Sequence, residues 1–125
     1  ISERESSSLH LVDGMLRRNT NELLHGTLDL LVLRSLSAGP MHGFAVSKWM
    51  DDRTQGALGI ADSALYKALG RLEDAGDIHG EWGLSENNRR AKYYALTSQG
   101  RRQLRTETAG WKQYVAVVTS ALEPG

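Results

Sequence analysis

A run of basic side chains late in the sequence is its clearest chemical feature. Six basic residues and no acidic one lie between Asn87 and Arg105, namely Arg89, Arg90, Lys92, Arg101, Arg102 and Arg105. The formal net charge of the chain is zero, yet residues 1–86 carry 8 basic and 13 acidic residues and residues 87–125 carry 7 and 2. Such a cluster is typical of a surface that binds phosphates or another polyanion. A solvated loop and helix face is the alternative, because a charge excess does not show where side chains point.

Composition limits the other classes of function. At 125 residues, 40% hydrophobic and 24% charged, the chain is expected to form one globular domain. It has no cysteine, which excludes disulfides, thiolate zinc sites and cysteine nucleophiles. The longest apolar stretch, residues 28–36, contains Asp29 and Arg34 and is far too short to span a membrane. Residues 1–8 lack the apolar core of a signal peptide, so a cytoplasmic protein is expected.

An enzyme is not expected, and neither is a cofactor. The sequence has four histidines but no HExxH, Gly-x-Ser-x-Gly, Walker A or GxGxxG motif. A metal site of histidines and carboxylates stays open as an alternative, although no paired ligand spacing requires one.

A central helix is predicted ahead of the basic run. Asn19 and Glu22 have the spacing of a capping box, and an apolar run begins at Leu23. Its apolar residues cover too much of the circumference for a surface helix, so this helix belongs in the core. Gly39 and Pro40 end it.

Two further helices follow in the prediction. The first covers about residues 42–50 and is ended by the polar stretch 51–55. The next has Asp62 or Ser63 as its N-cap and Gly76 as its left-handed stop. Apolar residues at helical spacing mark its buried face: Leu65, Leu69 and Leu72.

The spacing of the apolar residues then changes from the helical period to an alternation at every second residue. Residues 78–84 and 92–97 are predicted to pair as a β-hairpin whose tip, residues 85–90, carries two arginines. Thr97 caps a final helix with an apolar stripe made of Leu104, Trp111, Val115, Val118 and Leu122. The expected fold is mainly α with a small β-hairpin, a winged helix-turn-helix followed by a C-terminal dimerisation helix. We expect an N-terminal arm (1–18), helical or partly flexible, a DNA-binding domain (19–97) and the dimerisation helix (98–125).

Several segments of the sequence resemble the PadR family of bacterial transcriptional regulators. They are LHGTLDLLVL at 24–33, GPMHGF at 39–44, Leu65-Tyr66, Arg71-Leu72-Glu73 and RAKYYALT at 90–97. In that family the residues before and after the Leu-Tyr pair are usually Gly-Ser or Gly-Thr and Pro, whereas here they are Ser63-Ala64 and Lys67. This departure lies on the helix that the fold offers to the major groove, so the operator sequence is left open.

The winged fold points to double-stranded DNA as the partner. The start of the third helix is expected to reach base edges, with Ser63 and Lys67 as donors and Ala64 against a thymine methyl. Asp62 is unfavourable beside phosphate, and a role as N-cap accounts for it. Tyr66 has a core role as its alternative. The full set of expected DNA-binding residues is Ser63, Ala64, Tyr66, Lys67, Arg71, Arg89, Arg90 and Lys92.

The resemblance implies a homodimer that acts as a repressor at a near-palindromic promoter site. The stripe of the last helix forms the expected interface. Trp111 is also the candidate for a pocket that binds a small aromatic or drug-like effector, as in some members of the family, although plain interface packing is the preferred interpretation. The alternative function is a winged-helix module that binds protein or ligand with weak or no DNA binding. Salt dependence discriminates the two, because phosphate contacts weaken steeply with ionic strength.

Overall fold

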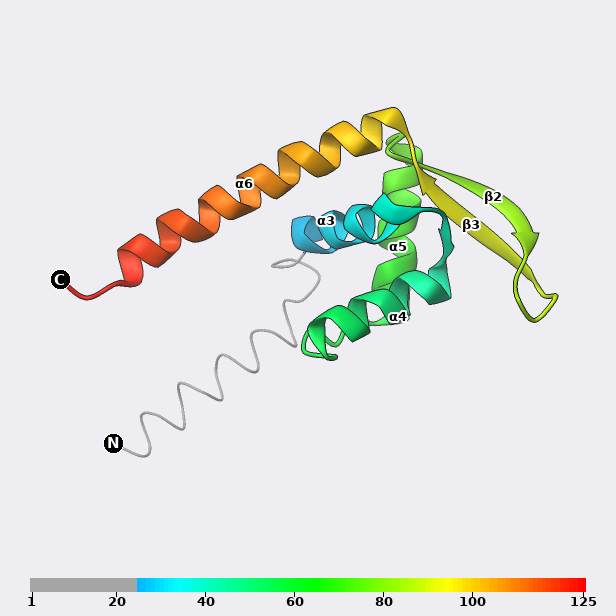
Figure 1. Cartoon of the computed structure of the whole chain (residues 1–125), viewed down its shortest axis with the longest axis horizontal. Coiled ribbons are helices and arrows are strands. Elements are labelled where there is room, and N and C mark those ends of the chain that lie inside the picture. The colour runs from blue at the N-terminus through cyan, green and yellow to red at the C-terminus, as the bar shows by residue number, and fades with distance from the viewer. Residues whose placement is uncertain (1–24) are drawn as a thin grey trace.

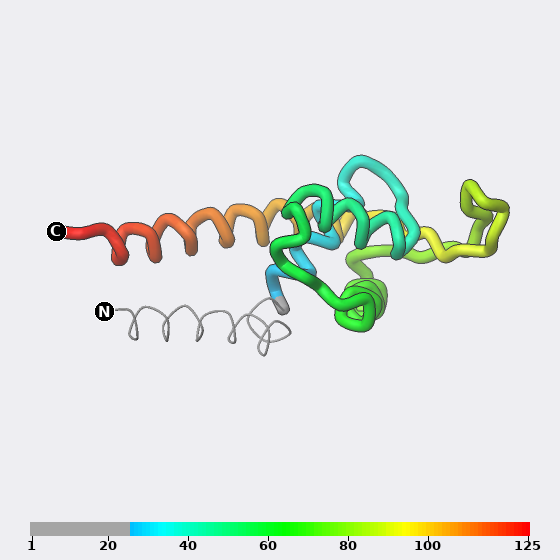
Figure 2. Tube along the Cα trace, turned by 90° about the horizontal axis from the view of Figure 1, so that it is seen from below, coloured from blue at the N-terminus to red at the C-terminus, as the bar shows by residue number. Residues whose placement is uncertain are grey.

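The computed structural model describes residues 25–125, so the predicted capping box at Asn19 and Glu22 and the N-terminal arm lie outside the described residues. The elements are arranged as a mainly helical domain from which one long helix projects on one side and a hairpin on the other (Figures 1 and 2). In chain order they are α3 (His25–Ser35), the 3₁₀ turn η1 (Leu36–Ala38), β1 (Met41–His42), α4 (Gly43–Thr54), α5 (Asp62–Asp74), β2 (Ile78–Leu84), β3 (Arg90–Leu96) and α6 (Ser98–Leu122). The predicted winged helix-turn-helix architecture is confirmed.

The core lies where α3, α4 and α5 pack together. Side chains from all three helices are almost fully buried: Val32, Leu33, Val46, Leu65 and Leu69 are at most 1% exposed. Each such side chain contributes roughly 1.5–3 kcal/mol by burial. The prediction that the first helix is central to the core is therefore confirmed, since α3 and the turn after it bury apolar groups on more than one side.

Helix α4 is longer than predicted. The polar stretch after Met50 does not end it but forms its last, solvent-facing turn. Lys48 pairs with Asp52 at 3.4 Å, and the Thr54 hydroxyl donates to the Met50 carbonyl oxygen at 2.8 Å. The helix ends at Thr54, and its C-cap is Gln55, whose φ of 54° is left-handed. The prediction failed because polar residues on an exposed face are compatible with a helix as well as with a loop.

The start of α5 also differs from the prediction. Its N-cap is Ala61, which makes no side-chain capping bond, and Asp62 is the first helical residue. The Asp62 carboxylate therefore stabilises the helix through the positive end of the helix dipole rather than as a cap. The predicted stop is confirmed, because Gly76 has a φ of 84° and its N–H donates to the Glu73 carbonyl oxygen.

The predicted hairpin belongs to a three-stranded antiparallel sheet in the order β1-β3-β2. Strands β2 and β3 pair from Ile78↔Leu96 to Leu84↔Arg90, so β3 begins two residues earlier than expected. The third strand, β1, was not predicted. It has two residues, and its pairing with β3, of Met41 with Tyr94 and of His42 with Tyr93, makes it a strand. Two residues are too few to show a period.

The first turn of α6 is packed tightly against the turn between α5 and β2. Thr97 is its N-cap, as predicted, and its hydroxyl accepts from the Gly100 N–H at 3.0 Å. The same hydroxyl donates to the Gly76 carbonyl oxygen at 2.7 Å. Gly100 is buried, and a Cβ at this position would collide with the carbonyl oxygen of Asp77. Only glycine fits this contact without a backbone shift.

Changing Gly100→Ala is therefore expected to lower the free energy of unfolding by about 1–3 kcal/mol, because the collision is with backbone and forces the helix to move. Gly110→Ala in the same helix is the matched control, since its added Cβ has no described atom within 4 Å apart from its chain neighbours and the backbone of its own helix. There the alanine should raise stability by about 0.5–1 kcal/mol. Denaturant unfolding of both variants measures the difference, and equal effects at the two glycines would show that the packing is not as described.

The C-terminal half of α6 extends beyond the domain (Figures 1 and 2). Leu104, one of the residues expected at a dimer interface, lies on the half of α6 that packs on the domain and is partly buried against its core. Its place in a dimer interface stays a prediction. No helix within residues 25–125 has the length and apolar character needed to cross a membrane.

Candidate nucleic-acid interface

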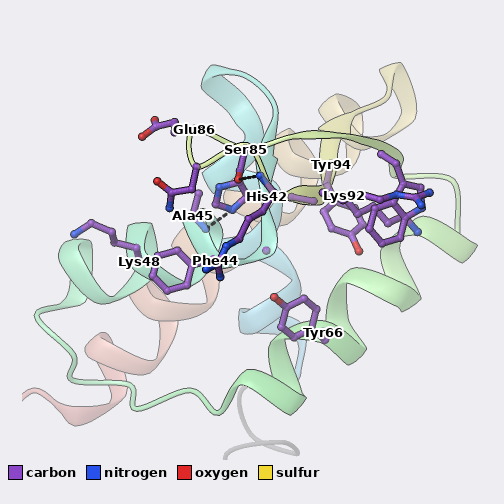
Figure 3. Close-up of a pocket in the computed structure, with 15 residues that line it drawn as sticks. His42, Phe44, Ala45, Lys48, Tyr66, Ser85, Glu86, Lys92 and Tyr94 are labelled. Carbon is purple, nitrogen blue, oxygen red and sulfur yellow. Dashed lines mark hydrogen bonds between the residues drawn. The ribbon is translucent and has the colours of Figure 1, made fainter.

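A groove of about 1040 Å³ lies between the start of α4, helix α5 and the β2–β3 hairpin. Figure 3 shows its side chains, with Tyr66 on α5 and Lys92 and Tyr94 on the hairpin. Of the predicted DNA-binding residues, the groove brings together Tyr66, Arg89, Arg90 and Lys92. The other four, Ser63, Ala64, Lys67 and Arg71, do not line it.

The beginning of α5 presents one exposed face. Ser63, Tyr66 and Lys67 are exposed at a spacing of three and four residues, whereas Ala64 is half-buried and packs against the core. The exposed face is continuous because Leu65 and Leu69 hold the opposite side of the helix in the core. Ser63 and Lys67 therefore offer a hydroxyl and an ammonium group to solvent in the first turns of the helix.

Tyr66 packs against the start of α4. A Cβ on Gly43 would lie 2.7–2.9 Å from the phenol of Tyr66, so the absence of a side chain at Gly43 leaves room for this contact. Next to it, His42 caps α4, and its Nδ1 accepts from the Ala45 N–H at 3.1 Å. Because Nδ1 is the acceptor, a neutral His42 carries its proton on Nε2. These contacts set the approach of α4 to α5 along one wall of the groove.

The hairpin tip places two guanidinium groups at the other wall. The Asn88 N–H donates to the Ser85 carbonyl oxygen at 2.9 Å, and the Ser85 N–H donates to that of Arg89 at 2.8 Å. Asn88 has a φ of 59°, the left-handed conformation that closes a three-residue hairpin loop. Arg89 and Arg90 are both exposed and follow this turn directly. The predicted hairpin tip is therefore an ordered turn.

Two of the predicted DNA-binding cations are engaged in ion pairs within the domain. Lys92 Nζ lies 2.9 Å from Glu73 Oε1, which links the hairpin to α5. This hydrogen bond raises the pKa of Lys92 above its ordinary value of 10.5, so the ammonium group stays charged at neutral pH. Arg71 Nη2 lies 2.7 Å from Asp29 Oδ1, which links α5 to α3. Both side chains thus position α5 between its neighbours.

Several groove residues were not among the predicted site residues. They are His42, Phe44, Lys48 and Trp82, among which Phe44 is 71% exposed and Trp82 is 60% exposed. Trp82 shares the alternating apolar pattern of β2 with Ile78, and this pattern predicts burial. The strand runs past the end of the core, so the pattern continues into solvent. Arg101, Arg102 and Arg105, the rest of the basic run, lie on α6 and do not line the groove.

The apolar stripe of α6 is open in the described structure. Trp111, Val115 and Val118 are 38–45% exposed, and Leu122 is 78% exposed. The rings of Trp111 and Tyr114 lie 6.2 Å apart, so the aromatic surface extends beyond the predicted stripe. A contiguous exposed apolar surface of this kind is typical of a protein interface.

Comparison with known proteins agrees with the architecture. The model of the transcriptional regulator PadR-like family matches residues 32–106. A PadR family transcriptional regulator from Eggerthella lenta is 32% identical and superposes with a TM-score of 0.74, over 93% of this chain and 99% of the other. A transcriptional regulator from Clostridium thermocellum is 26% identical, with a TM-score of 0.73 over 82% and 96%.

The fold is also that of Bacillus subtilis PadR, whose structure was determined in complex with operator DNA. That likeness has 23% identity and a TM-score of 0.57, over 63% of this chain and 45% of the other. The family match covers more than half of the chain. It includes α4, α5 and the β2–β3 hairpin, which is the wing of the winged helix-turn-helix. The protein belongs to the PadR-like family of transcriptional regulators.

Proposed function

We propose that this protein is a sequence-specific DNA-binding regulator that acts as a homodimeric repressor at a near-palindromic promoter site. The observation that carries the proposal is the groove flanked by the exposed face of α5 on one side and by Arg89 and Arg90 on the other. This arrangement suits a duplex whose major groove receives α5 while the wing lies on the adjacent backbone or minor groove. Bacillus subtilis PadR, which shares this fold, was determined in complex with operator DNA, and this supports DNA as the partner.

Within this proposal the eight predicted residues have different roles. Ser63 and Lys67, with Tyr66 beside the groove, face the bases or phosphates nearest α5, while Arg89 and Arg90 contact the backbone from the wing. Arg71 and Lys92 act indirectly, because their charges are paired with Asp29 and Glu73. Ala64, half-buried on the edge of the exposed face, lies close to any base that α5 approaches.

Dimerisation follows from the open stripe of α6. Pairing of two stripes about a two-fold axis buries Trp111, Val115, Val118 and Leu122 and sets two α5 helices on one side of the dimer. Half-sites about 34 Å apart then meet the two recognition helices. Occupation of a promoter by such a dimer blocks transcription.

In this proposal Trp111 packs in the dimer interface, and an aromatic effector beside it is the second use of the same surface. An effector acts there only if it binds better to a dimer with one spacing of the α5 helices than to another. Titration of aromatic compounds against a protein–DNA complex tests this, and unchanged DNA affinity throughout would leave interface packing as the sole role of Trp111.

Selection of duplexes from a random pool by the full chain, repeated at two salt concentrations, tests the proposed function. Enrichment of an inverted repeat, with affinity that falls as salt rises, is the expected result. If the folded, dimeric protein enriches no sequence and its binding does not respond to salt, the proposal fails. The alternative, a winged-helix module for a protein or ligand partner, then takes its place.

A further inference from the structure

Trp82 is a large apolar side chain that β2 carries past the end of the core and into the lining of the groove. It lies on the same face of β2 as Ile78, which is 2% exposed, but the Trp82 side chain is 60% exposed. Beyond the core this face of the hairpin overhangs the groove opposite α5. The indole therefore contributes little to the packing of the domain. A role in the groove explains better why a tryptophan lies at this position.

Arg90 lies directly on this indole. The guanidinium carbon is 4.7 Å from the centroid of the Trp82 ring, within the range of a cation–π contact. In the β2–β3 ladder Trp82 pairs with Lys92 and Leu84 pairs with Arg90, so Trp82 and Arg90 are diagonal neighbours on one face. Side chains at this spacing are within reach of one another when they are long or aromatic. The register of the hairpin thus brings the side chains of Trp82 and Arg90 together.

Arg90 is held in a different way from the neighbouring cations. Lys48, Arg71 and Lys92 each pair with a carboxylate, of Asp52, Asp29 and Glu73 respectively. Arg90 has no carboxylate partner within 4.0 Å among the residues that the structure describes. A carboxylate holds a guanidinium group but neutralises it, whereas an indole face holds it and leaves the charge and the N–H donors free.

We propose that Trp82 is a positioning residue that holds the uncompensated Arg90 guanidinium at the groove for contact with a DNA phosphate. The inference rests on the proposed function and adds to it the group that orders the wing contact. An exposed arginine loses side-chain entropy when it binds phosphate, and a preformed stack removes part of that loss. The contact is with the backbone, so its effect is the same for every duplex sequence.

A double-mutant cycle tests the proposal, with binding to a labelled random-sequence duplex as the readout. Trp82→Ala is expected to weaken binding about fivefold, the equivalent of a cation–π contact of about 1 kcal/mol, and Trp82→Phe to retain most of the affinity. In the Arg90→Ala background, Trp82→Ala should cause no further loss, because the group that it positions is gone. In the Arg89→Ala background the fivefold loss should persist, which makes Arg89 the matched control. Circular dichroism melting confirms that each variant is folded.

The outcomes separate the inference from the proposed function. A fivefold loss that is the same with and without Arg90 would overturn the positioning role and show that Trp82 contacts DNA or stabilises the wing by itself. No loss on Trp82→Ala would overturn it as well. If the unaltered protein bound neither the random duplex nor a selected one, the proposed function would fail first. If the unaltered protein binds DNA but the effects of Trp82→Ala and Arg90→Ala are additive, only the inference about Trp82 fails.

Discussion

Replacing Trp111 and Val115 by glutamate is expected to convert the protein to monomers and to abolish tight binding to a duplex with two half-sites. The stripe on α6 is apolar and exposed in the described structure, and its pairing would bury four new carboxylates per dimer. Each unpaired buried charge costs several kcal/mol, so the dimer dissociation constant should rise at least about a thousandfold, which corresponds to about 4 kcal/mol. Sedimentation velocity measures the change in mass directly.

The control for this variant uses the opposite side of the same helix segment. Gln113 and Ser120 are exposed and polar, and a helix of 3.6 residues per turn places both on the side opposite the stripe. Changing both to glutamate adds acidic groups without touching the apolar face, so this variant should remain dimeric. A Trp111→Glu, Val115→Glu variant that still sediments as a dimer would place the interface elsewhere in the chain.

Removal of both wing arginines is expected to have the second large effect. With Arg89→Ala and Arg90→Ala together, affinity for duplex DNA should fall by about one to two orders of magnitude at moderate salt, equally for selected and random sequences. For each phosphate contact that is lost, DNA binding releases about one counterion fewer. The slope of log affinity against log salt should therefore flatten by up to about two units. Fluorescence anisotropy titrations at several salt concentrations give both quantities.

Arg53 provides a control for the wing variant, because it is a stacked arginine outside the groove. Its guanidinium carbon lies 4.9 Å from the centroid of the Trp49 ring, a stack like that of Arg90, but Arg53 does not line the groove. Arg53→Ala removes one positive charge and should leave the salt slope close to that of the unaltered protein. An affinity and slope unchanged by the loss of both wing arginines would remove the wing from the DNA interface.

The sequence by itself determined the features that depend on neighbouring residues. Helical spacing of apolar residues identified the core helices, and Gly76 and Thr97 marked the stop of α5 and the cap of α6. The two-residue period identified the hairpin, and the turn residues identified its tip. These features are local because caps, stops and periods are set by backbone conformation within a few residues.

Tertiary contacts decided the rest. Strand β1 exists only because Met41 and His42 pair with β3 from a distant part of the chain, and Leu104 is partly buried because the first half of α6 lies on the domain. The pairing of Arg71 with Asp29 and of Lys92 with Glu73 joins residues 42 and 19 positions apart. No local pattern contains such partners. Whether a predicted cation is free or paired therefore depends on how α3, α5 and the hairpin come together in space.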